Sequence, residues 1–337
     1  DKMQELMEKL EQGVKDVFSS SQYKEYLTVM SKFYNYSFNN VLLIAMQKPD
    51  ASLVAGFSAW KNHFGRHVKK GEKGIKIMAP ISRKVKAEEK REEGSQNENT
   101  GKAEDPEQET GTRKIITGFK VVSVFDISQT EGKDLPEYYG TKELFGDVEG
   151  YEDLFAAVRE TSPVPVGFEN IPGETHGYYH QIEKRIALQE GMGELQNIKT
   201  LIHETAHARL HAIDPAAPEE ERADQPDQST REVQAESVAY VVCQHYGLDT
   251  SDYSFAYVAG WSSGKEMPEL RASLDVIRNT ARDTITAIDR QLSLRREYEK
   301  ESPEIEQRKI KQEEPAAGMS KGKPGEPEKG KEMVRCL

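Results

Sequence analysis

Hydrophobic positions near the N-terminus recur every three or four residues, which is the period of an amphipathic helix. The pattern predicts a first helix over residues 3–18 and a second over residues 26–46, which Pro49 closes. Beyond these helices the period changes to short apolar runs broken by glycine. Residues 115–129, IITGFKVVSVFDISQ, are rich in β-branched and aromatic side chains, as strands are. The first part of the chain therefore reads as an α+β block.

The second half of the chain is mostly helical in pattern. Residues 151–160 are predicted as a helix, and residues 178–189, YYHQIEKRIALQ, as one strand with alternating polarity. Two more helices are predicted over residues 194–211 and 230–246, separated by a polar, proline-containing loop. A long amphipathic helix closes the block, because these apolar residues keep the three-and-four spacing: Leu270, Leu274, Ile277, Ala281, Ile285, Ile288 and Leu292.

Two tracts have almost no large apolar side chains and cannot offset the entropy of ordering. One is the acidic tract 86–114, and the other is the tail, 299–337, rich in lysine, glutamate, proline and glycine. They divide the chain into an N-terminal α+β domain, 1–140, with a disordered acidic insertion, and a mostly helical domain, 141–298, with a small antiparallel sheet. The overall fold class is α+β.

Composition adds limits on the class of protein. The chain has 337 residues, of which 36% are hydrophobic and 31% charged, and its net charge is −12. Such a charge argues against unspecific attraction to nucleic acid, provided that it is evenly spread. The two cysteines, Cys243 and Cys336, exclude a disulfide scaffold. Without a long apolar stretch or a signal-like N-terminus, we expect a soluble, cytoplasmic protein with no membrane contact.

The strongest chemical signal is His203-Glu204-Thr205-Ala206-His207, an HExxH motif within a predicted helix. The i, i+4 spacing puts both imidazoles on one helical face, where they can reach one metal ion. Zinc suits imidazole ligands, and a catalytic zinc takes three protein ligands and leaves a position for water. Glu204 lies one residue along, so we expect it to act as general base toward that water. The motif predicts one Zn²⁺ per chain and a metallopeptidase reaction.

The third ligand is expected on the next predicted helix, where Glu232 and Glu236 share a face. In glutamate-type zincins the first of two such carboxylates binds zinc, and the second holds a ligand histidine through its other ring nitrogen. This favours Glu232 as the ligand. Ser229 and Glu232 also match a capping box, which would occupy Glu232 with the helix N-terminus and leave Glu236 as the ligand.

Further histidines are weaker candidates. Three histidines on one straight helix cannot all converge on one ion, so His211 is expected at the pocket wall or the helix end. The remaining histidines and tyrosines near the motif are expected to be structural, although His180 could touch substrate: His176, His180, His245, Tyr178 and Tyr179.

The negative net charge is unevenly distributed. Between residues 51 and 84 eight basic residues stand against one acid, Glu72, and aromatic and amide side chains precede them. A dense cationic patch binds phosphates by counterion release, and unpaired bases stack on aromatic rings. These features predict binding of single-stranded DNA. The candidate residues are Tyr34, Tyr36, Asn39, Asn40, Trp60, Lys61, Arg66, Lys69, Lys70, Lys73 and Lys76.

Two stretches resemble a known family. Residues 36–80, with Asn39-Asn40, Gln47, Trp60, Arg66 and the KKGEKG turn, and the FDISQT run at 125–130 resemble the N-terminal single-stranded-DNA-binding domain of ArdC-type antirestriction proteins. LIHETAHARLH and REVQAESVAYVVC resemble the metallopeptidase domain that follows in those proteins, which is similar to the ImmA/IrrE zinc peptidases. The resemblance implies a mobile-element protein that binds single-stranded DNA and protects incoming DNA from host restriction.

Three functions compete at this point. In the first, the protein docks on single-stranded DNA and cleaves a nearby, unknown protein substrate. In the second, the zinc site only stabilises the fold and the protein coats DNA. In the third, the peptidase cleaves a repressor of its own mobile element. The first assigns Glu204 a catalytic role, whereas the second does not.

Overall fold

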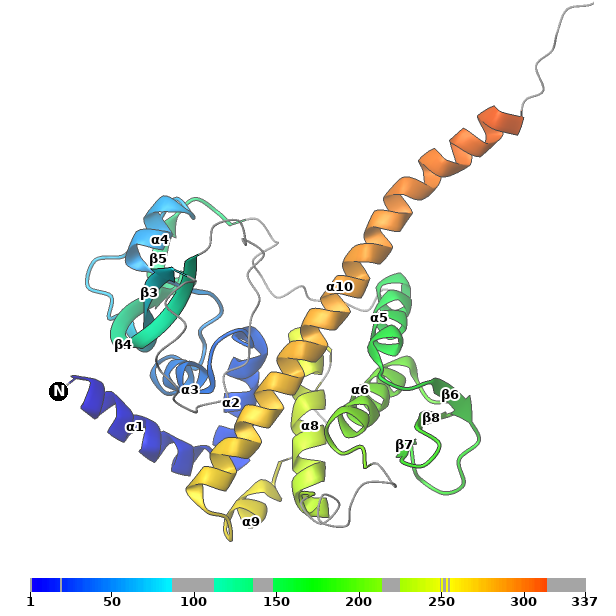
Figure 1. Ribbon diagram of the computed structural model, residues 1–337, viewed down its shortest axis with the longest axis horizontal. Helices are drawn as coiled ribbons and strands as arrows, with labels where there is room; N and C mark the ends of the chain where they lie inside the picture. Colours follow the sequence, from blue (N-terminus) through cyan, green and yellow to red (C-terminus); the bar gives the residue numbers. More distant parts are fainter. Residues whose placement is uncertain are drawn as a thin grey trace, which may run out of the picture. The chain divides into compact units, whose positions relative to one another are not determined.

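The computed structural model describes most of the chain. The described residues are 2–18, 20–86, 112–135, 148–213, 225–248, 250, 253 and 255–313. Asp1–Leu292 form one compact unit and Ser293–Leu337 a second. Helices and small sheets alternate along the first unit (Figure 1). The predicted α+β class is confirmed.

The N-terminal helices are α1 (Lys2–Val17), α2 (Ser20–Lys32) and α3 (Phe38–Gln47). The single helix predicted over 26–46 is wrong, because a turn separates α2 from α3. The backbone N–H of Tyr36 donates to the carbonyl of Phe33 at 2.9 Å, and the two rings contact each other at 5.8 Å. The aromatic pair stabilises a turn at a point where the hydrophobic pattern predicted that the helix would continue.

The predicted strands of this half are present. β1 (Val54–Gly56), β4 (Thr112–Asp126) and β3 (Ile75–Lys86) form an antiparallel sheet in the order β1-β4-β3. The tract predicted as disordered over 86–114 is thus strand at residue 86 and at 112–114, and its remainder lies outside the described residues. Smaller elements complete this half: α4 (Phe57–Asn62), β2 (Arg66–Val68), the 3-10 helix η2 (Ile127–Gln129) and β5 (Thr130–Gly132), which pairs with β2.

Two amides of α3 pair with the outer edge of β3. The Asn40 side chain donates to the carbonyl and accepts from the N–H of Met78, both at 2.8 Å. Two turns later, the Gln47 side chain makes the same pair of bonds with the backbone of Lys76. Residues two apart on a strand point their backbone groups to the same edge. Asn40 and Gln47 therefore cover a sheet edge that would otherwise be unpaired.

The second half is built around a small mixed sheet. β6 (Val166–Glu169) runs parallel to β8 (Arg185–Gln189), and β7 (Gly177–His180) runs antiparallel to β8, in the order β6-β8-β7. The single strand predicted over 178–189 is wrong, since a turn joins β7 to β8 and Lys184 adopts a positive φ of 50°. The sheet is mixed and not purely antiparallel as predicted.

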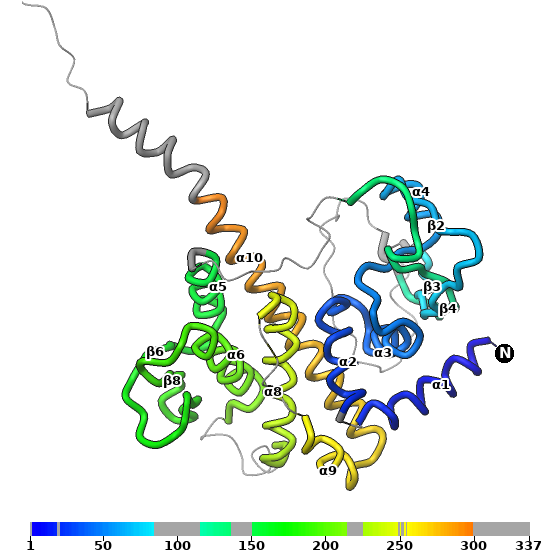
Figure 2. Tube along the Cα trace, turned by 180° about the vertical axis from the view of Figure 1, so that it is seen from behind, coloured from blue at the N-terminus to red at the C-terminus, as the bar shows by residue number. Residues whose placement is uncertain are grey.

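The helices of this half are α5 (Val148–Thr161), α6 (Glu194–Leu210), α8 (Gln228–His245), α9 (Val258–Ser262) and α10 (Met267–Glu313). Three of them, α5, α6 and α8, lie close to their predicted bounds, whereas α9 was not predicted and α10 is longer than expected. In both views α6 lies between α8 and the β6-β8-β7 sheet (Figures 1 and 2). Helix α10 continues through residues 299–313, which were predicted as disordered. Residues 314–337 lie outside the described part.

The two predicted domains share one core. Helix α2 packs against α8, where the hydroxyls of Tyr23 and Ser237 are hydrogen-bonded at 2.7 Å inside the core. Next to this pair, the ring of Tyr23 contacts that of Phe255 at 5.3 Å. One turn along, the hydroxyls of Thr28 and Tyr240 are 2.8 Å apart. The two blocks predicted as separate domains are thus parts of one compact unit.

Among the described residues, none of the helices combines the length and the apolar character that crossing a bilayer requires.

Candidate metal centre

Two neighbouring helices bring the predicted ligands together. His203 and His207 lie on α6 with their Nε2 atoms 3.1 Å apart. Glu232 on α8 places Oε2 3.6 Å from each of these nitrogens. One ligand atom from each residue lies within 4.8 Å of the others. Two imidazoles and a carboxylate at this spacing are a donor set that fits zinc.

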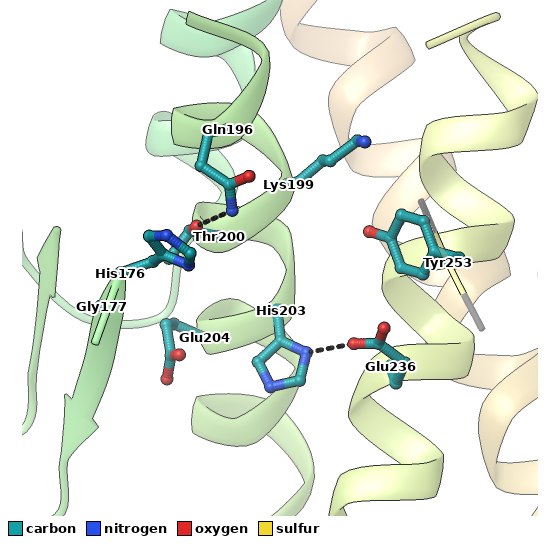
Figure 3. A pocket seen from close by; sticks show the side chains of 9 residues that line it. All are labelled: His176, Gly177, Gln196, Lys199, Thr200, His203, Glu204, Glu236 and Tyr253. Atoms are coloured by element: carbon teal, nitrogen blue, oxygen red, sulfur yellow. Dashed lines mark hydrogen bonds and ion pairs between the residues drawn. The ribbon is translucent and has the colours of Figure 1, made fainter. Parts of the chain in front are cut away.

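Glu236 occupies the position expected of a supporting group. Its Oε2 lies 3.2 Å from Nδ1 of His203 (Figure 3), whereas Glu232 lies near the other ring nitrogen, Nε2. A carboxylate at Nδ1 holds the ring so that Nε2 presents its lone pair to a metal. The geometry favours Glu232 over Glu236 as the third ligand.

The capping-box alternative for Glu232 is wrong. The N-cap residue of α8 is Asp227, whose carboxylate accepts the backbone N–H of Thr230 at 2.8 Å. The hydroxyl of Ser229 donates to the same carboxylate. Asp227 therefore satisfies the helix N-terminus, and the Glu232 side chain is available to the histidines.

Glu204 faces the other side of α6, toward β7 (Figure 3). Its side chain is 8% exposed and lines the same two pockets as His203. Burial raises the pKa of the Glu204 carboxyl, and the nearby histidines and a backbone hydrogen bond from Tyr179 only partly oppose this. A carboxyl with a raised pKa can accept and release a proton nearer neutral pH.

A buried polar chain supports the second histidine. Nδ1 of His207 lies 3.0 Å from Nδ1 of His211, and Nε2 of His211 lies 3.0 Å from Oε1 of Gln234. The Gln234 amide nitrogen donates to Ser273 at 2.9 Å, so its oxygen is left as the acceptor. Nε2 of His211 must then carry the proton, and its Nδ1 accepts from His207. This arrangement leaves Nε2 of His207 as a lone pair for a metal.

Gln234 and Ser273 are functional candidates that the sequence reasoning missed. Both side chains are buried, and this chain of hydrogen bonds satisfies their polar groups. The single signal in the sequence was a glutamine within the apolar face of a helix. His211 lies at the end of α6, as expected.

Burial disfavours the charged form of His203, but hydrogen bonds to the carboxylates of Glu232 and Glu236 outweigh it and raise the pKa of His203 to about 10. The same contacts with His203 and His207 lower the pKa of Glu232 far below its ordinary value. Without a metal ion, His203 therefore carries a proton that its hydrogen bonds share with these carboxylates. Binding a cation at His203 releases this proton, because neutral imidazole is the ligand.

Two pockets adjoin the candidate ligands. The larger one, about 520 Å³, contains the HExxH side chains and Glu232 and extends to His211 and Arg231. The smaller one, about 280 Å³, lies toward the N-terminal end of α6 and is lined by Gln196, Lys199 and Tyr253, among others (Figure 3). Both pockets open to solvent beside β7, so an extended chain has access to the ligands.

Other predicted histidines and tyrosines have structural contacts. His245 bonds the backbone carbonyl of Ser31 at 2.9 Å and so joins α8 to α2. Nδ1 of His180 accepts the N–H of Glu183 in the β7–β8 turn. The Tyr178 hydroxyl donates to Glu169. His176 and Tyr179 line the pockets.

Several residues proposed to contact DNA are structural instead. Trp60 is 0% exposed and its Nε1–H donates to the carbonyl of Phe125 at 2.8 Å, so its ring offers no face to a base. Asn40 is buried in its pairing with β3. Tyr34 and Tyr36 are half-buried against His245 and Phe33. Asn39 is half-buried, and its Oδ1 has no hydrogen-bond partner among the residues that the structure describes.

The basic candidates divide into two groups. The Arg66 guanidinium bonds Thr130 and the carbonyl of Lys133, which ties β2 to β5. The lysines are exposed, although Lys69 donates to the carbonyl of Ser128 and Lys76 to Ser123. The exposed lysines among the candidates are Lys61, Lys69, Lys70, Lys73 and Lys76.

An aromatic surface beside these lysines was not predicted. The β3–β4 register places Phe119 and Ser123 on the same sheet face as Lys76, and Phe125 pairs with β1 on that face. Phe57 and Phe119 are 60% and 57% exposed, and the Phe57 and Phe125 rings touch at 6.2 Å. We call Phe57, Phe119, Phe125 and Lys76 the aromatic sheet face. Alternation along β4 was its only sequence signal.

Comparisons with known proteins agree with this architecture. Residues 2–125 match the family profile described as the N-terminal domain of anti-restriction factor ArdC. Residues 159–246 match the peptidase M78 profile, described as an IrrE N-terminal-like domain. The second profile spans all the candidate metal ligands.

Two similar proteins add context. An uncharacterized protein of Bacillus anthracis is 29% identical over 330 residues, which is 88% of this chain and 53% of that protein. The chain thus spans about half the length of this relative. The crystal structure of antirestriction ArdC from the R388 plasmid, in a metal-free form, is 23% identical. It covers 77% of this chain and 84% of that one, with a TM-score of 0.42. By its two matched profiles, this chain is an ArdC-like protein in which the N-terminal domain of anti-restriction factor ArdC precedes an IrrE-like domain of the M78 peptidases.

Proposed function

We propose that the protein is a zinc-dependent peptidase that acts while bound to single-stranded DNA. The observation that carries the peptidase half is the convergence of His203, His207 and Glu232 beside Glu204 in one open pocket. A zinc ion that only stabilised the fold would have four protein ligands and no accessible base. Here three candidate ligands would leave a bound zinc ion one position for water. Glu204 lines the same pocket as these ligands.

Each side chain has a distinct part in the proposed reaction. A bound zinc ion would polarise the scissile carbonyl and acidify water. Glu204 takes the proton of the attacking water and gives it to the departing amine, which its raised pKa favours. Glu236 and His211 keep the two ligand imidazoles in the orientation that directs Nε2 toward Glu232.

The substrate is expected to bind as an extended chain along β7. This strand is the last in the order β6-β8-β7, so only one of its edges pairs with β8. Gly177, Tyr178 and Tyr179 of this strand line the pocket that contains His203 and Glu204. An extended peptide can add to such an edge through main-chain hydrogen bonds.

The peptidase proposal is tested with Glu204→Gln. We expect this variant to keep one zinc ion per chain and to lose cleavage of host or mobile-element proteins in a lysate, measured by mass spectrometry of new peptide termini. Glu194→Gln, an exposed acid on the same helix, is the matched control and should cleave normally. Cleavage by Glu204→Gln at the wild-type rate would refute the mechanism. A zinc-binding wild type that cleaves nothing would favour a purely structural zinc. A cleaved repressor of the mobile element would favour a regulatory protease.

The aromatic sheet face supports the DNA-binding half of the proposal. Exposed rings of Phe57 and Phe119 offer flat surfaces on which unpaired bases stack. Lys76 lies on the same face, and the exposed lysines Lys70 and Lys73 precede β3. These cations would neutralise phosphates next to the stacked bases. The combination fits single strands better than duplex DNA, whose bases are not free to stack.

We expect Phe119→Ala to weaken binding of an unstructured oligonucleotide about tenfold, because one stacking contact is worth about 1–3 kcal/mol. Lys73→Ala should weaken binding less and lower its salt dependence. The control is Phe168→Ala, which removes an exposed ring from β6. Fluorescence anisotropy over a range of salt concentrations measures all three variants. Equal affinity of Phe119→Ala and wild type would show that the sheet face is not the DNA site.

Together these activities suggest an antirestriction protein that acts on incoming single-stranded DNA during transfer of a mobile element. Protection of such DNA from restriction in cells, compared between wild type, Glu204→Gln and Phe119→Ala, separates the two halves. Loss in Phe119→Ala alone would assign protection to DNA binding, and loss in both would require peptidase action as well.

A further inference from the structure

The larger pocket contains the positively charged side chain of Arg231, whose presence there the proposed reaction does not explain. Arg231 lines this pocket together with the candidate ligands and immediately precedes Glu232. It is half-buried, and its Nε is buried without a hydrogen-bond partner among the described residues. A buried, unpaired donor on a charged group is costly, and native proteins usually pair such groups.

Two further features make Arg231 unfavourable for the fold itself. It is the fourth residue of α8, near the end of the helix whose dipole disfavours positive charge. Its nearest carboxylate in sequence, Glu232, is directed at His203 and His207 and not at the guanidinium. Within the described part of the protein, the Arg231 guanidinium thus has no anionic partner.

The charge of the pocket indicates what the partner is. Two carboxylates, Glu204 and Glu232, and one guanidinium line it. A divalent cation on the candidate ligands leaves the pocket with a net positive charge. A guanidinium prefers a carboxylate, with which it forms two parallel, charge-assisted hydrogen bonds. A neutral peptide carbonyl would not compensate the charge.

We propose that Arg231 binds a carboxylate of the peptide substrate next to the scissile bond. The carboxylate belongs either to an aspartate or glutamate side chain or to the C-terminus of the substrate. This inference rests on the proposed peptidase function, because it assigns a substrate class to the same site. It makes the protein selective for acidic or C-terminal segments.

The experiment uses four fluorescein-labelled pools of random tetrapeptides. Their last residue is Glu or Gln, and each pool is made with an amidated or a free C-terminus. Binding to zinc-loaded Glu204→Gln protein is measured by fluorescence anisotropy, and again after a chelator has removed the metal. Since no cleavage is needed, the result does not depend on peptidase activity.

We expect a carboxylate-bearing pool to bind at least about tenfold more tightly than the Gln amide pool, given the strength of charge-assisted bonds. Preference for the Glu amide pool would identify a side-chain carboxylate. Preference for the Gln free-acid pool would identify a terminal one. Adding Arg231→Met should abolish the preference in both metal states, while Arg231→Lys should retain part of it. Arg290→Met, which removes an exposed arginine from α10, should change nothing.

Equal binding of all four pools, or a preference that survives Arg231→Met, would overturn the assignment. If Arg231→Met does not fold, as judged by its melting curve, the comparison of Arg231→Lys with wild type still decides. Failure of the peptidase proposal has a different signature. In that case wild type cleaves nothing, yet the Arg231-dependent preference for carboxylates remains.

Discussion

Some buried polar side chains of this protein each form hydrogen bonds with several backbone groups. Asp126 is an example, since its carboxylate accepts the N–H groups of Ser52, Leu53 and Ser128. The Gln129 side chain completes the arrangement by accepting the N–H of Asp126. One carboxylate thereby connects the entry to β1 with the end of β4. The FDISQT resemblance in the sequence therefore marks a structural joint of the N-terminal half.

Asp126→Asn should lower the free energy of unfolding by about 2 kcal/mol at pH 7, since hydrogen bonds to a charged group are lost. Burial raises the pKa of Asp126, but the hydrogen bonds from Ser128, Ser52 and Leu53 outweigh it, so the pKa lies below its ordinary value. Because its pKa is lower in the folded than in the unfolded state, Asp126 stabilises the fold at pH values above its unfolded-state pKa of about 4. This stabilisation is lost as the pH falls below that value toward the folded-state pKa. The gap between wild type and variant should thus shrink below about pH 4.

Urea unfolding at several pH values measures this gap. Asp134→Asn, at an exposed acid nearby, is the control and should match wild type at every pH. A gap that grew on acidification would contradict the assigned role of the Asp126 carboxylate.

We expect His211 to influence the affinity for metal and not the reaction itself. His211→Phe removes the group that accepts a hydrogen bond from Nδ1 of His207. Without this bond, His207 is no longer held in the tautomer whose Nε2 is free to bind a metal. Loss of such a supporting partner typically costs 10–100-fold in metal affinity, so we expect zinc to bind about tenfold more weakly. Competition with a chromophoric chelator measures the change, and the exposed His67→Phe is the control. Unchanged affinity would mean that Gln234 and Ser273 do not act through His211.

At the scale of elements, the approach of β7 to α6 creates the cleft. A Cβ on Gly177 would lie 2.6 Å from Cγ2 of Thr200 and 2.8 Å from the carbonyl oxygen of Ala187. Only glycine lets the strand pass this close to the helix that bears the HExxH motif. Backbone proximity of this kind brings the Tyr179 N–H to the Glu204 carboxylate.

Gly177→Ala should therefore lower stability by about 1–3 kcal/mol, the usual cost of overpacking, and reduce cleavage by moving β7 away from Glu204. Gly167→Ala is a matched control in the same sheet, because a Cβ there meets nothing within 4 Å. Thermal melting and cleavage assays on both variants test this. Similar behaviour of the two variants would show that β7 tolerates displacement.

The pattern of hydrophobic residues predicted the helices better than the strands. Helices α6 and α8 were expected almost at their observed bounds, because long segments average many weak preferences. The turn between β7 and β8 was missed, since it contains no glycine or proline and uses Lys184 at positive φ. The break between α2 and α3 was missed because the aromatic residues there fit either a helix or a turn.

At the scale of the molecule, the N-terminal helices share one core with the half that contains the candidate metal centre. Helix α8 carries Glu232 and Glu236 on the side facing α6 and buries Ser237 and Tyr240 against α2. Lys24 of α2 also donates to the backbone carbonyls of Thr250 and Tyr253. The half proposed to bind DNA and the candidate metal centre are thus connected through packed helices.

A fragment of residues 141–298 should consequently fail to fold stably, although it contains every candidate ligand. Without α2, the apolar and hydroxyl groups on α8 are exposed or unpaired. Circular dichroism and zinc titration of this fragment, compared with residues 1–292, measure the effect. A fragment that melts cooperatively with bound zinc would mean that the two halves are independent domains.

The sequence by itself determined the fold class, the HExxH helix and the helix that carries the third candidate ligand, because helical periodicity and motif spacing are local properties. The sequence also located the cationic stretch between residues 51 and 84, which the negative net charge of the whole chain does not reveal. Only the tertiary structure favours Glu232 over Glu236 as the third candidate ligand, because the distance from each carboxylate to the two imidazoles depends on how α8 packs against α6. It likewise buried Trp60 and exposed Phe119, since burial is set by which elements cover a residue, and that information is spread over the whole chain.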